Sequence, residues 1–181
     1  MKKTLLVFGA LVGAAFAQAQ QIVQRDPVIE DLVRQISADS LRAHVAGLVQ
    51  FGTRHTMSTT TDPRRGIGAA RRWVLAKFNE YARQSGGRMT ARLDAWTLKP
   101  DGRRVDKPQE IGNVIATLKG TDPADDRIFL VSGHIDSRVT NVMNRDADAP
   151  GANDDGSGTA AVIELARVLS KARFPATVLF C

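Results

Sequence analysis

The first half of the chain has the hydrophobic spacing of helices. Apolar residues recur every three or four positions in three stretches, as they do on one face of a helix. The first stretch contains Val28, Leu32, Val33 and Ile36, the second Leu41, Val45, Leu48 and Val49, and the third Ala70, Trp73, Val74, Phe78 and Tyr81. We expect Asp39 or Ser40 to cap the second helix, and the third helix to run from about Gly68 to Arg83.

Beyond Gly86-Gly87 the spacing changes to that of strands, beginning with residues 89–95, where apolar and polar positions alternate. The further expected elements are strands over residues 111–118, 127–132 and 176–181, and a helix from about Gly158 to Lys171. The strand over 127–132 is almost continuously apolar, which is typical of a central strand covered on both faces.

The alternation of strands and helices predicts an α/β fold with a mixed, mostly parallel sheet flanked by helices. We expect residues 20–87 to form an N-terminal helical segment and residues 88–181 the first part of the α/β core. The chain ends within an apolar strand. Either that strand lies at an edge of the sheet beside a natural terminus, or the chain is a fragment, truncated before the domain is complete.

The first 19 residues have the pattern of a signal peptide. Lys2 and Lys3 precede an apolar run over residues 4–15, which is short for a membrane span of about 20 residues. Small residues at positions 15, 17 and 19 predict cleavage after Ala17 or Ala19. We therefore expect a periplasmic or secreted protein without stable membrane insertion once the signal is removed.

Composition and charge narrow the range of partners. The 181 residues are 43% hydrophobic and 24% charged, as in globular proteins, and the formal net charge is +6. The basic residues come in isolated pairs, and aromatic residues make up only 6% of the chain. A surface that binds nucleic acid needs a denser stripe of basic residues, or aromatic residues interleaved with the basic ones, so we expect no nucleic-acid partner.

A histidine and an aspartate follow the most apolar strand, in the motif Gly133-His134-Ile135-Asp136-Ser137. In open α/β sheets, ligands bind outside the carboxyl ends of strands. On an extended backbone, His134 and Asp136 lie on the same side. The histidine can then bind a metal through one ring nitrogen, while the aspartate orients the imidazole by accepting a hydrogen bond from the N–H of the other ring nitrogen. Taken alone, this short motif also fits an ordinary histidine beside an acid.

Two adjacent carboxylates stand just before the last expected helix, in the motif Pro150-Gly151-Ala152-Asn153-Asp154-Asp155-Gly156-Ser157-Gly158. A helix N-terminus favours negative charge, and glycines allow the backbone to turn sharply. Two acids this close repel each other unless a positive group, commonly a divalent cation, lies beside them. Imidazole and carboxylate together are good zinc ligands, but a catalytic zinc site normally takes three protein ligands.

Both motifs resemble those of the di-zinc aminopeptidases of metallopeptidase family twenty-eight. The resemblance extends from about Ile111 to the end, through Ile111-Gly112-Asn113-Val114-Ile115-Ala116, the two motifs with Thr159, the helix over 160–169 and Thr177-Val178-Leu179-Phe180. Earlier stretches, Phe51-Gly52-Thr53-Arg54-His55 and Gly66-Ile67-Gly68-Ala69-Ala70-Arg71, are similar but less diagnostic.

The resemblance implies a role for each residue of the two motifs. His134 would bind one zinc, and Asp154 would bridge two zincs. Asp136 is assigned to the catalytic set, as the residue that holds His134 in place. Asp155 would follow Asp154 across a cis peptide bond, and Asp155 and Gly156 would support the site structurally.

The remaining catalytic groups of that family lie beyond this chain. A general-base glutamate and a metal-binding glutamate follow the strand that begins here at Ala176, with a further Asp and a His later. None of these is present before Cys181. The resemblance therefore favours the fragment interpretation and implies that the chain alone is inactive.

The implied function is that of an exported zinc-dependent exopeptidase, of which this chain is the N-terminal part. The resemblance favours an aminopeptidase that acts on peptide or protein N-termini through two zincs and a metal-activated water. Two alternatives stay open: a non-catalytic or single-metal relative of the same fold, and a periplasmic binding module without metal.

Overall fold

The structure, a computed structural model, describes residues 25–181. The signal peptide predicted over residues 1–19 lies outside this range. The elements are α1 (Pro27–Arg34), α2 (Ala38–Val49), α3 (Gly66–Gln84), β1 (Met89–Leu98), β2 (Gln109–Leu118), β3 (Ile128–Val131), α4 (Gly156–Leu169) and β4 (Thr177–Phe180). None of these helices is long and apolar enough to cross a membrane.

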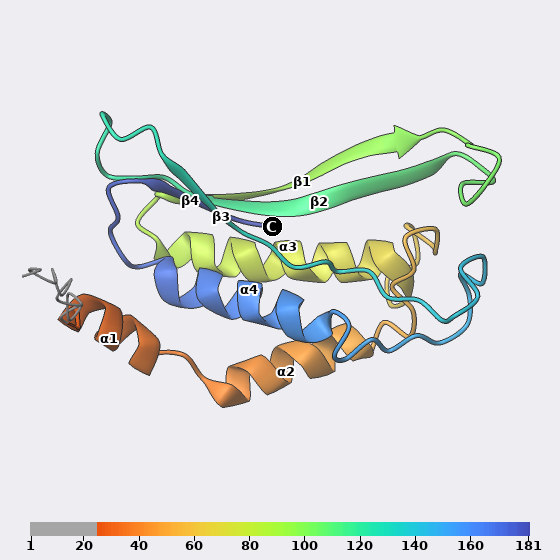
Figure 1. Cartoon of the computed structure of the whole chain (residues 1–181), viewed down its shortest axis with the longest axis horizontal. Helices are drawn as coiled ribbons and strands as arrows, with labels where there is room; N and C mark the ends of the chain where they lie inside the picture. The colour runs from red at the N-terminus through yellow and green to blue at the C-terminus, as the bar shows by residue number, and fades with distance from the viewer. Residues whose placement is uncertain (1–24) are drawn as a thin grey trace, which may run out of the picture.

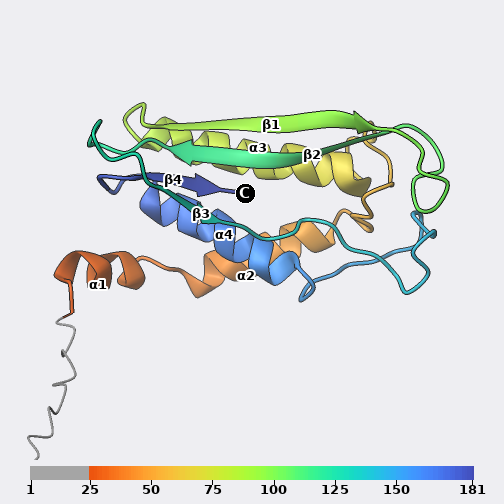
Figure 2. The ribbon, with the colours of Figure 1, turned by 45° about the horizontal axis from the view of Figure 1, so that its top comes forward.

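The helices lie on one face of a four-stranded sheet (Figure 1). α3 packs directly against β1 and β2, and α4 lies beside α3 and contacts β4. α2 packs on α4, on the side away from the sheet (Figure 2). The expected helix over 68–83 is thus confirmed as α3, and the one over 158–171 as α4, which begins two residues earlier.

The caps of the first two helices are serine and aspartate side chains. Asp26 Oδ1 accepts a hydrogen bond from Val28 N at 2.8 Å at the start of α1. Ser37 Oγ accepts one from Ser40 N at 3.2 Å at the start of α2. The prediction of Asp39 or Ser40 as the cap is therefore wrong, because α2 already begins at Ala38 and both residues lie inside its first turn.

The strand order is β1-β2-β4-β3. β1 pairs with β2 and β2 with β4 in antiparallel fashion, whereas β3 and β4 are parallel. The expected mixed sheet flanked by helices is confirmed, but the expected parallel majority is not seen among the four strands of the described residues. β4 lies between β2 and β3, so the alternative that places the last strand at an edge is wrong.

β3 is the edge strand of the described sheet, although its sequence predicts a central one. Its residues Ile128, Phe129 and Leu130 are 62%, 55% and 62% exposed. β3 pairs only with β4. No helix of residues 25–181 covers the face of the sheet that points away from α3 and α4 (Figures 1 and 2). The prediction of coverage on both faces is wrong within the described residues because no described element lies there.

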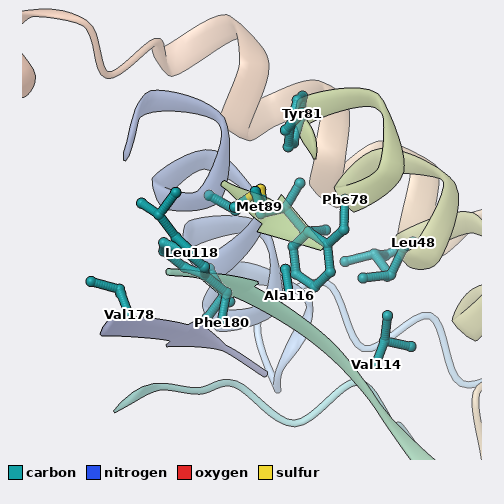
Figure 3. Packing of buried hydrophobic residues seen from close by; sticks show 13 residues of the cluster. Leu48, Phe78, Tyr81, Met89, Val114, Ala116, Leu118, Val178 and Phe180 are labelled. Carbon is teal, nitrogen blue, oxygen red and sulfur yellow. The ribbon is translucent and has the colours of Figure 1, made fainter. Parts of the chain in front are cut away.

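The core fills the space between the sheet and the helices (Figure 3). Phe78 of α3 lies among Leu118 and Ala116 of β2 and Phe180 of β4, and each is at most 1% exposed. Leu48 of α2 is fully buried in the same cluster. Burying a side chain of this size stabilises the fold by about 1.5–3 kcal/mol, so this cluster fixes α3 and the sheet against each other.

A buried carboxylate joins the start of α2 to α4. Glu164 is 1% exposed and accepts hydrogen bonds from Ser37 N at 2.7 Å and from Arg167 Nε and Nη2 at 2.8 and 2.6 Å. Arg167 also donates to Gln35 O at 2.7 Å. Burial by itself raises the pKa of Glu164, but the bonds from Arg167 and Ser37 outweigh it, so this pKa lies below its usual value.

We predict that Glu164→Gln lowers the free energy of unfolding by about 2 kcal/mol at neutral pH, because the hydrogen bonds to Arg167 lose their charge assistance. A carboxylate with a depressed pKa stabilises the folded state above its unfolded pKa, and that contribution is lost as the pH falls. The difference in the free energy of unfolding between the wild type and the variant should therefore shrink below about pH 4. Urea unfolding over a pH series measures this difference.

Glu80→Gln is the matched control. Glu80 forms a pair with Lys77 at 3.5 Å, in which both side chains keep about a third or more of their surface exposed, and pairs near the surface contribute about 0–1 kcal/mol. Equal losses of stability in the two variants would contradict the role assigned to Glu164.

Candidate metal centre

His134 lies just beyond the carboxyl end of β3, between two carboxylates. Its Nδ1 atom is 3.2 Å from Asp136 Oδ1, and its Nε2 atom is 3.1 Å from Asp154 Oδ1. The side chains of His134, Asp136 and Asp154 are 59%, 42% and 89% exposed. The structure thus brings together the three residues that the sequence places in the site, although they come from segments about 20 residues apart.

Asp155 connects the two segments. It is the N-cap of α4, and its Oδ1 atom accepts a hydrogen bond from Gly158 N at 3.0 Å. Its Oδ2 atom accepts another from His134 N, also at 3.0 Å. The peptide bond between Asp154 and Asp155 is cis, as the resemblance implied. Asp155 therefore turns its side chain toward the helix and the end of β3, whereas Asp154 stays exposed beside the imidazole.

Two glycines allow this close approach. A Cβ atom on Gly133 would lie 2.9 Å from Gly158 C and Thr159 N, so any larger residue would push the end of β3 away from α4. A Cβ atom on Gly156 would lie 2.7 Å from Gly151 O, the carbonyl that accepts its N–H at 2.9 Å. The structural role predicted for Gly156 thus corresponds to a tight turn into α4.

The electrostatics of His134 favour a positive charge at this position. Partial burial works against the charged imidazole, but the carboxylates of Asp136 and Asp155 outweigh it and raise the pKa of His134. When the imidazole is neutral and Nδ1–H faces Asp136, Nε2 presents a lone pair to Asp154. Two lone pairs 3.1 Å apart repel each other unless a proton or a cation lies between them.

The donor set fits zinc, but only as part of a site. Two ligands on one tetrahedral zinc lie roughly 3.4 Å apart, given metal–ligand distances of about 2.0–2.2 Å. The separation of 3.1 Å between His134 Nε2 and Asp154 Oδ1 is close to that value. Across residues 25–181, however, no three His, Cys, Asp or Glu side chains come together as a metal site. The ligand roles of His134 and Asp154 therefore stay predictions.

A cleft of about 660 Å³ adjoins the histidine. His134, Asp136 and Asp155 line one side, and Phe78, Trp96 and Ile111 are among its apolar residues. β4 pairs with β2 only over Ala116–Leu118. The cleft therefore runs beside a part of β2 that pairs with β1 on one edge and with no strand of the described residues on the other. His134 thus opens onto a mostly apolar cleft at the end of the sheet, whereas Asp154 lines an adjoining, more polar hollow together with His134 and Asp136.

Three contributors to the site were missed in the sequence. Thr56 Oγ1 donates to Asp136 Oδ2 at 3.0 Å and holds the carboxylate that faces the imidazole. Arg54 and Ser137 are buried, 1% and 5% exposed, and connect the loops that carry the metal pair. The Phe51-Gly52-Thr53-Arg54-His55 stretch is similar to the family, and this likeness was the only signal for Arg54, whereas Thr56 follows that stretch and had none.

Comparisons with known proteins show which family this chain resembles. Residues 113–181 match the sequence profile of peptidase family M28. A protein of Pyricularia oryzae described as "Probable zinc metalloprotease" is 49% identical over 155 residues, which cover 86% of this chain and 30% of that protein. The chain spans about a third of the length of the curated relatives it matches.

Solved structures share the fold at low sequence identity. An aminopeptidase from Aneurinibacillus sp. strain AM-1 superimposes with a TM-score of 0.61 at 14% identity, over 83% of this chain and 63% of that one. A glutaminyl cyclase from Porphyromonas gingivalis gives a TM-score of 0.57 at 22% identity, over 80% and 46% of the two chains. The same fold therefore occurs in proteins with different named activities.

We predict that Asp136→Asn reduces the population of the His134 tautomer that carries its proton on Nδ1, because a neutral amide accepts that hydrogen bond less strongly than a carboxylate. The ¹⁵N chemical shifts of the His134 ring at alkaline pH measure the tautomer directly. Asp126→Asn, an exposed change away from the site, is the control. An unchanged ring spectrum in the Asp136 variant would show that Asp136 does not orient His134.

Proposed function

This chain resembles peptidase family M28 in sequence and in fold, and on that premise we propose that it forms part of an exported zinc-dependent aminopeptidase. The similar curated proteins are described as zinc metalloproteases, so zinc and peptide-bond hydrolysis are the coarse features of the family. Two zincs, the aminopeptidase specificity and export are the finer parts of the proposal.

One observation carries the proposal. His134 has one ring nitrogen beside Asp136 and presents the other to Asp154 at 3.1 Å, at the end of a strand and beside a cleft. An imidazole oriented by a carboxylate is a common arrangement of zinc-binding histidines. The ring nitrogens of buried His55 instead face backbone atoms, Val142 O and Met57 N.

Each residue of the site has a distinct task in the proposed reaction. His134 and Asp154 would hold zinc, which when bound polarises the scissile carbonyl and lowers the pKa of a water. Asp136 keeps the Nδ1 proton of His134 in place and leaves Nε2 free. Asp155 holds the backbone of His134 against the start of α4. The exposed carboxylates nearby suit the free amine of a peptide N-terminus, which we propose as the substrate.

The described residues supply only part of what hydrolysis needs. Two donors, His134 and Asp154, fall short of the three protein ligands of a typical catalytic zinc. The two acids beside them, Asp136 and Asp155, are engaged with the ring and the backbone N–H of His134. We therefore propose that the 181-residue chain by itself binds zinc weakly and hydrolyses no peptide bond. The activity belongs to the whole protein.

We predict that His134→Ala and Asp154→Asn each weaken zinc binding to the 181-residue chain by at least about tenfold, because each removes a ligand atom. Competition with a chromophoric zinc chelator measures this, and exposed Asp126→Asn is the control. Hydrolysis of aminoacyl anilides by the same protein should stay at the level of the blank.

The outcomes separate the alternatives. Zinc affinity unchanged by His134→Ala would reject the ligand role and favour a binding module without metal. Hydrolysis of anilides by the wild-type chain that is lost in His134→Ala would overturn the proposed inactivity. In the whole protein, one bound zinc in place of two would favour a single-metal relative.

Export rests on the residue pattern at the start of the chain. We predict that expression with its own N-terminus in a cell with a secretory pathway releases a mature protein that begins at Gln18 or Gln20. Intact mass measurement of the released protein distinguishes the two cleavage sites. Ala17→Leu together with Ala19→Leu should block cleavage, and retention of Met1 in the wild-type product would reject export by this route.

A further inference from the structure

Arg54 has the largest of the fully buried side chains, with 1% of its surface exposed. It lies in the loop between α2 and α3, and its guanidinium forms no ion pair with a carboxylate of the described residues. A buried cation is costly unless hydrogen bonds compensate it, so the partners of Arg54 indicate what it does.

The guanidinium of Arg54 is surrounded by backbone carbonyls from three segments. Its Nε atom donates to Ile135 O at 2.7 Å, in the segment that carries His134. Its Nη1 and Nη2 atoms donate to Pro150 O at 2.7 Å and Gly151 O at 3.0 Å, in the segment that leads to Asp154. Nη1 also donates to Leu48 O at 3.0 Å, near the end of α2.

Ser137 repeats the same connection through a second set of bonds. Its N–H donates to Arg54 O at 3.3 Å, and its Oγ atom accepts from Arg54 N at 3.2 Å. The same hydroxyl donates to Ala149 O at 2.6 Å. Arg54 and Ser137, which we call the loop clamp, thus join the His134 segment to the Asp154 segment through buried hydrogen bonds.

No regular secondary structure holds these two segments together. Residues 132–137 and 150–155 contain neither helix nor strand, and the site-side links between them are the bond from His134 N to Asp155 and the pairing of His134 with Asp154. The loop clamp is the part of this connection that is buried. A shift of either loop would change the separation of the two donor atoms directly.

We propose that Arg54, with Ser137, is a positioning residue that sets the separation of His134 Nε2 from Asp154 Oδ1. This inference rests on the proposed metal function of that pair. Arginine suits the task because its rigid, planar group aims several N–H donors in different directions at once. Lysine would keep the charge but concentrate its donors at one point, so it could not bond all three segments.

Arg54→Lys tests the proposal in the 181-residue chain, with two measurements on each protein. The first is zinc affinity by chelator competition, which should weaken by about tenfold. The second needs no metal: the exchange rate of the His134 amide hydrogen, measured by NMR, should rise by about tenfold as the bond to Asp155 opens more often.

Arg167→Lys is the matched control, because Arg167 also donates to a backbone carbonyl of another segment, Gln35 O at 2.7 Å. It lies near the opposite end of α4 from Asp155, roughly 18 Å away at about 1.5 Å per helical residue. This variant should lose stability and yet leave both measurements at the wild-type values. Thermal unfolding records the loss of stability in each variant.

The results decide between the possibilities. Zinc affinity and amide exchange of Arg54→Lys within twofold of the wild type would overturn the proposal, as would equal changes in Arg167→Lys. If the wild type binds no zinc but Arg54→Lys still speeds exchange of the His134 amide, the loop clamp stands and the metal function fails.

A second variant keeps the test decisive if Arg54→Lys does not fold. Ser137→Ala removes the hydroxyl that joins Arg54 N to Ala149 O and leaves the buried charge intact. Weaker zinc binding and faster His134 amide exchange than in the wild type support the loop clamp. Wild-type values of both in Ser137→Ala would overturn it.

Discussion

The close approach of the end of β3 to the start of α4 is the contact on which the whole site depends. Gly133 leaves no room there for a side chain, since an added Cβ would lie 2.9 Å from the backbone of Gly158 and Thr159. At that distance the carboxylate of Asp155 can cap α4 and bind the His134 N–H with its two oxygens. Thr159 Oγ1 closes the contact from the other side by donating to His134 O at 3.1 Å. A strand end and a helix start become one unit, and the imidazole projects from it.

The charges of this region form a layered arrangement. The N-terminus of α4 carries a partial positive charge, which favours the carboxylates of Asp154 and Asp155. Arg54 lies behind the loops and contributes a full positive charge in a buried position. The exposed side of the same loops carries His134 between two acids. In this region the buried charge, that of Arg54, is positive. The exposed imidazole and carboxylates have lone pairs that are available to a metal ion.

Motifs that act locally could be predicted from the sequence, whereas contacts between distant segments could not. The pairing of His134 with Asp136 follows from the period of an extended chain, and the role of Asp155 as a helix cap follows from its place before α4. Arg54 belongs to neither pattern, because its partners, Ile135 and Pro150, lie about 80 to 100 residues away. The exposure of β3 was missed for a related reason: an apolar run indicates that a strand can be covered, and only the arrangement of the other elements shows whether it is.

The strand order also has a consequence for the order in which the molecule can fold. β4 lies between β2 and β3, so β3 finds no strand partner until β4, which lies about 50 residues further along the chain, has been made. The entropy cost of closing a loop of that length must be met before the β3–β4 contacts stabilise the sheet. The pairing of β3 with β4 should therefore form more slowly than the β1–β2 hairpin. His134 follows β3 directly. The hairpin and its helices should therefore assemble first, and the end of β3, with His134, should take its place beside Asp154 only later.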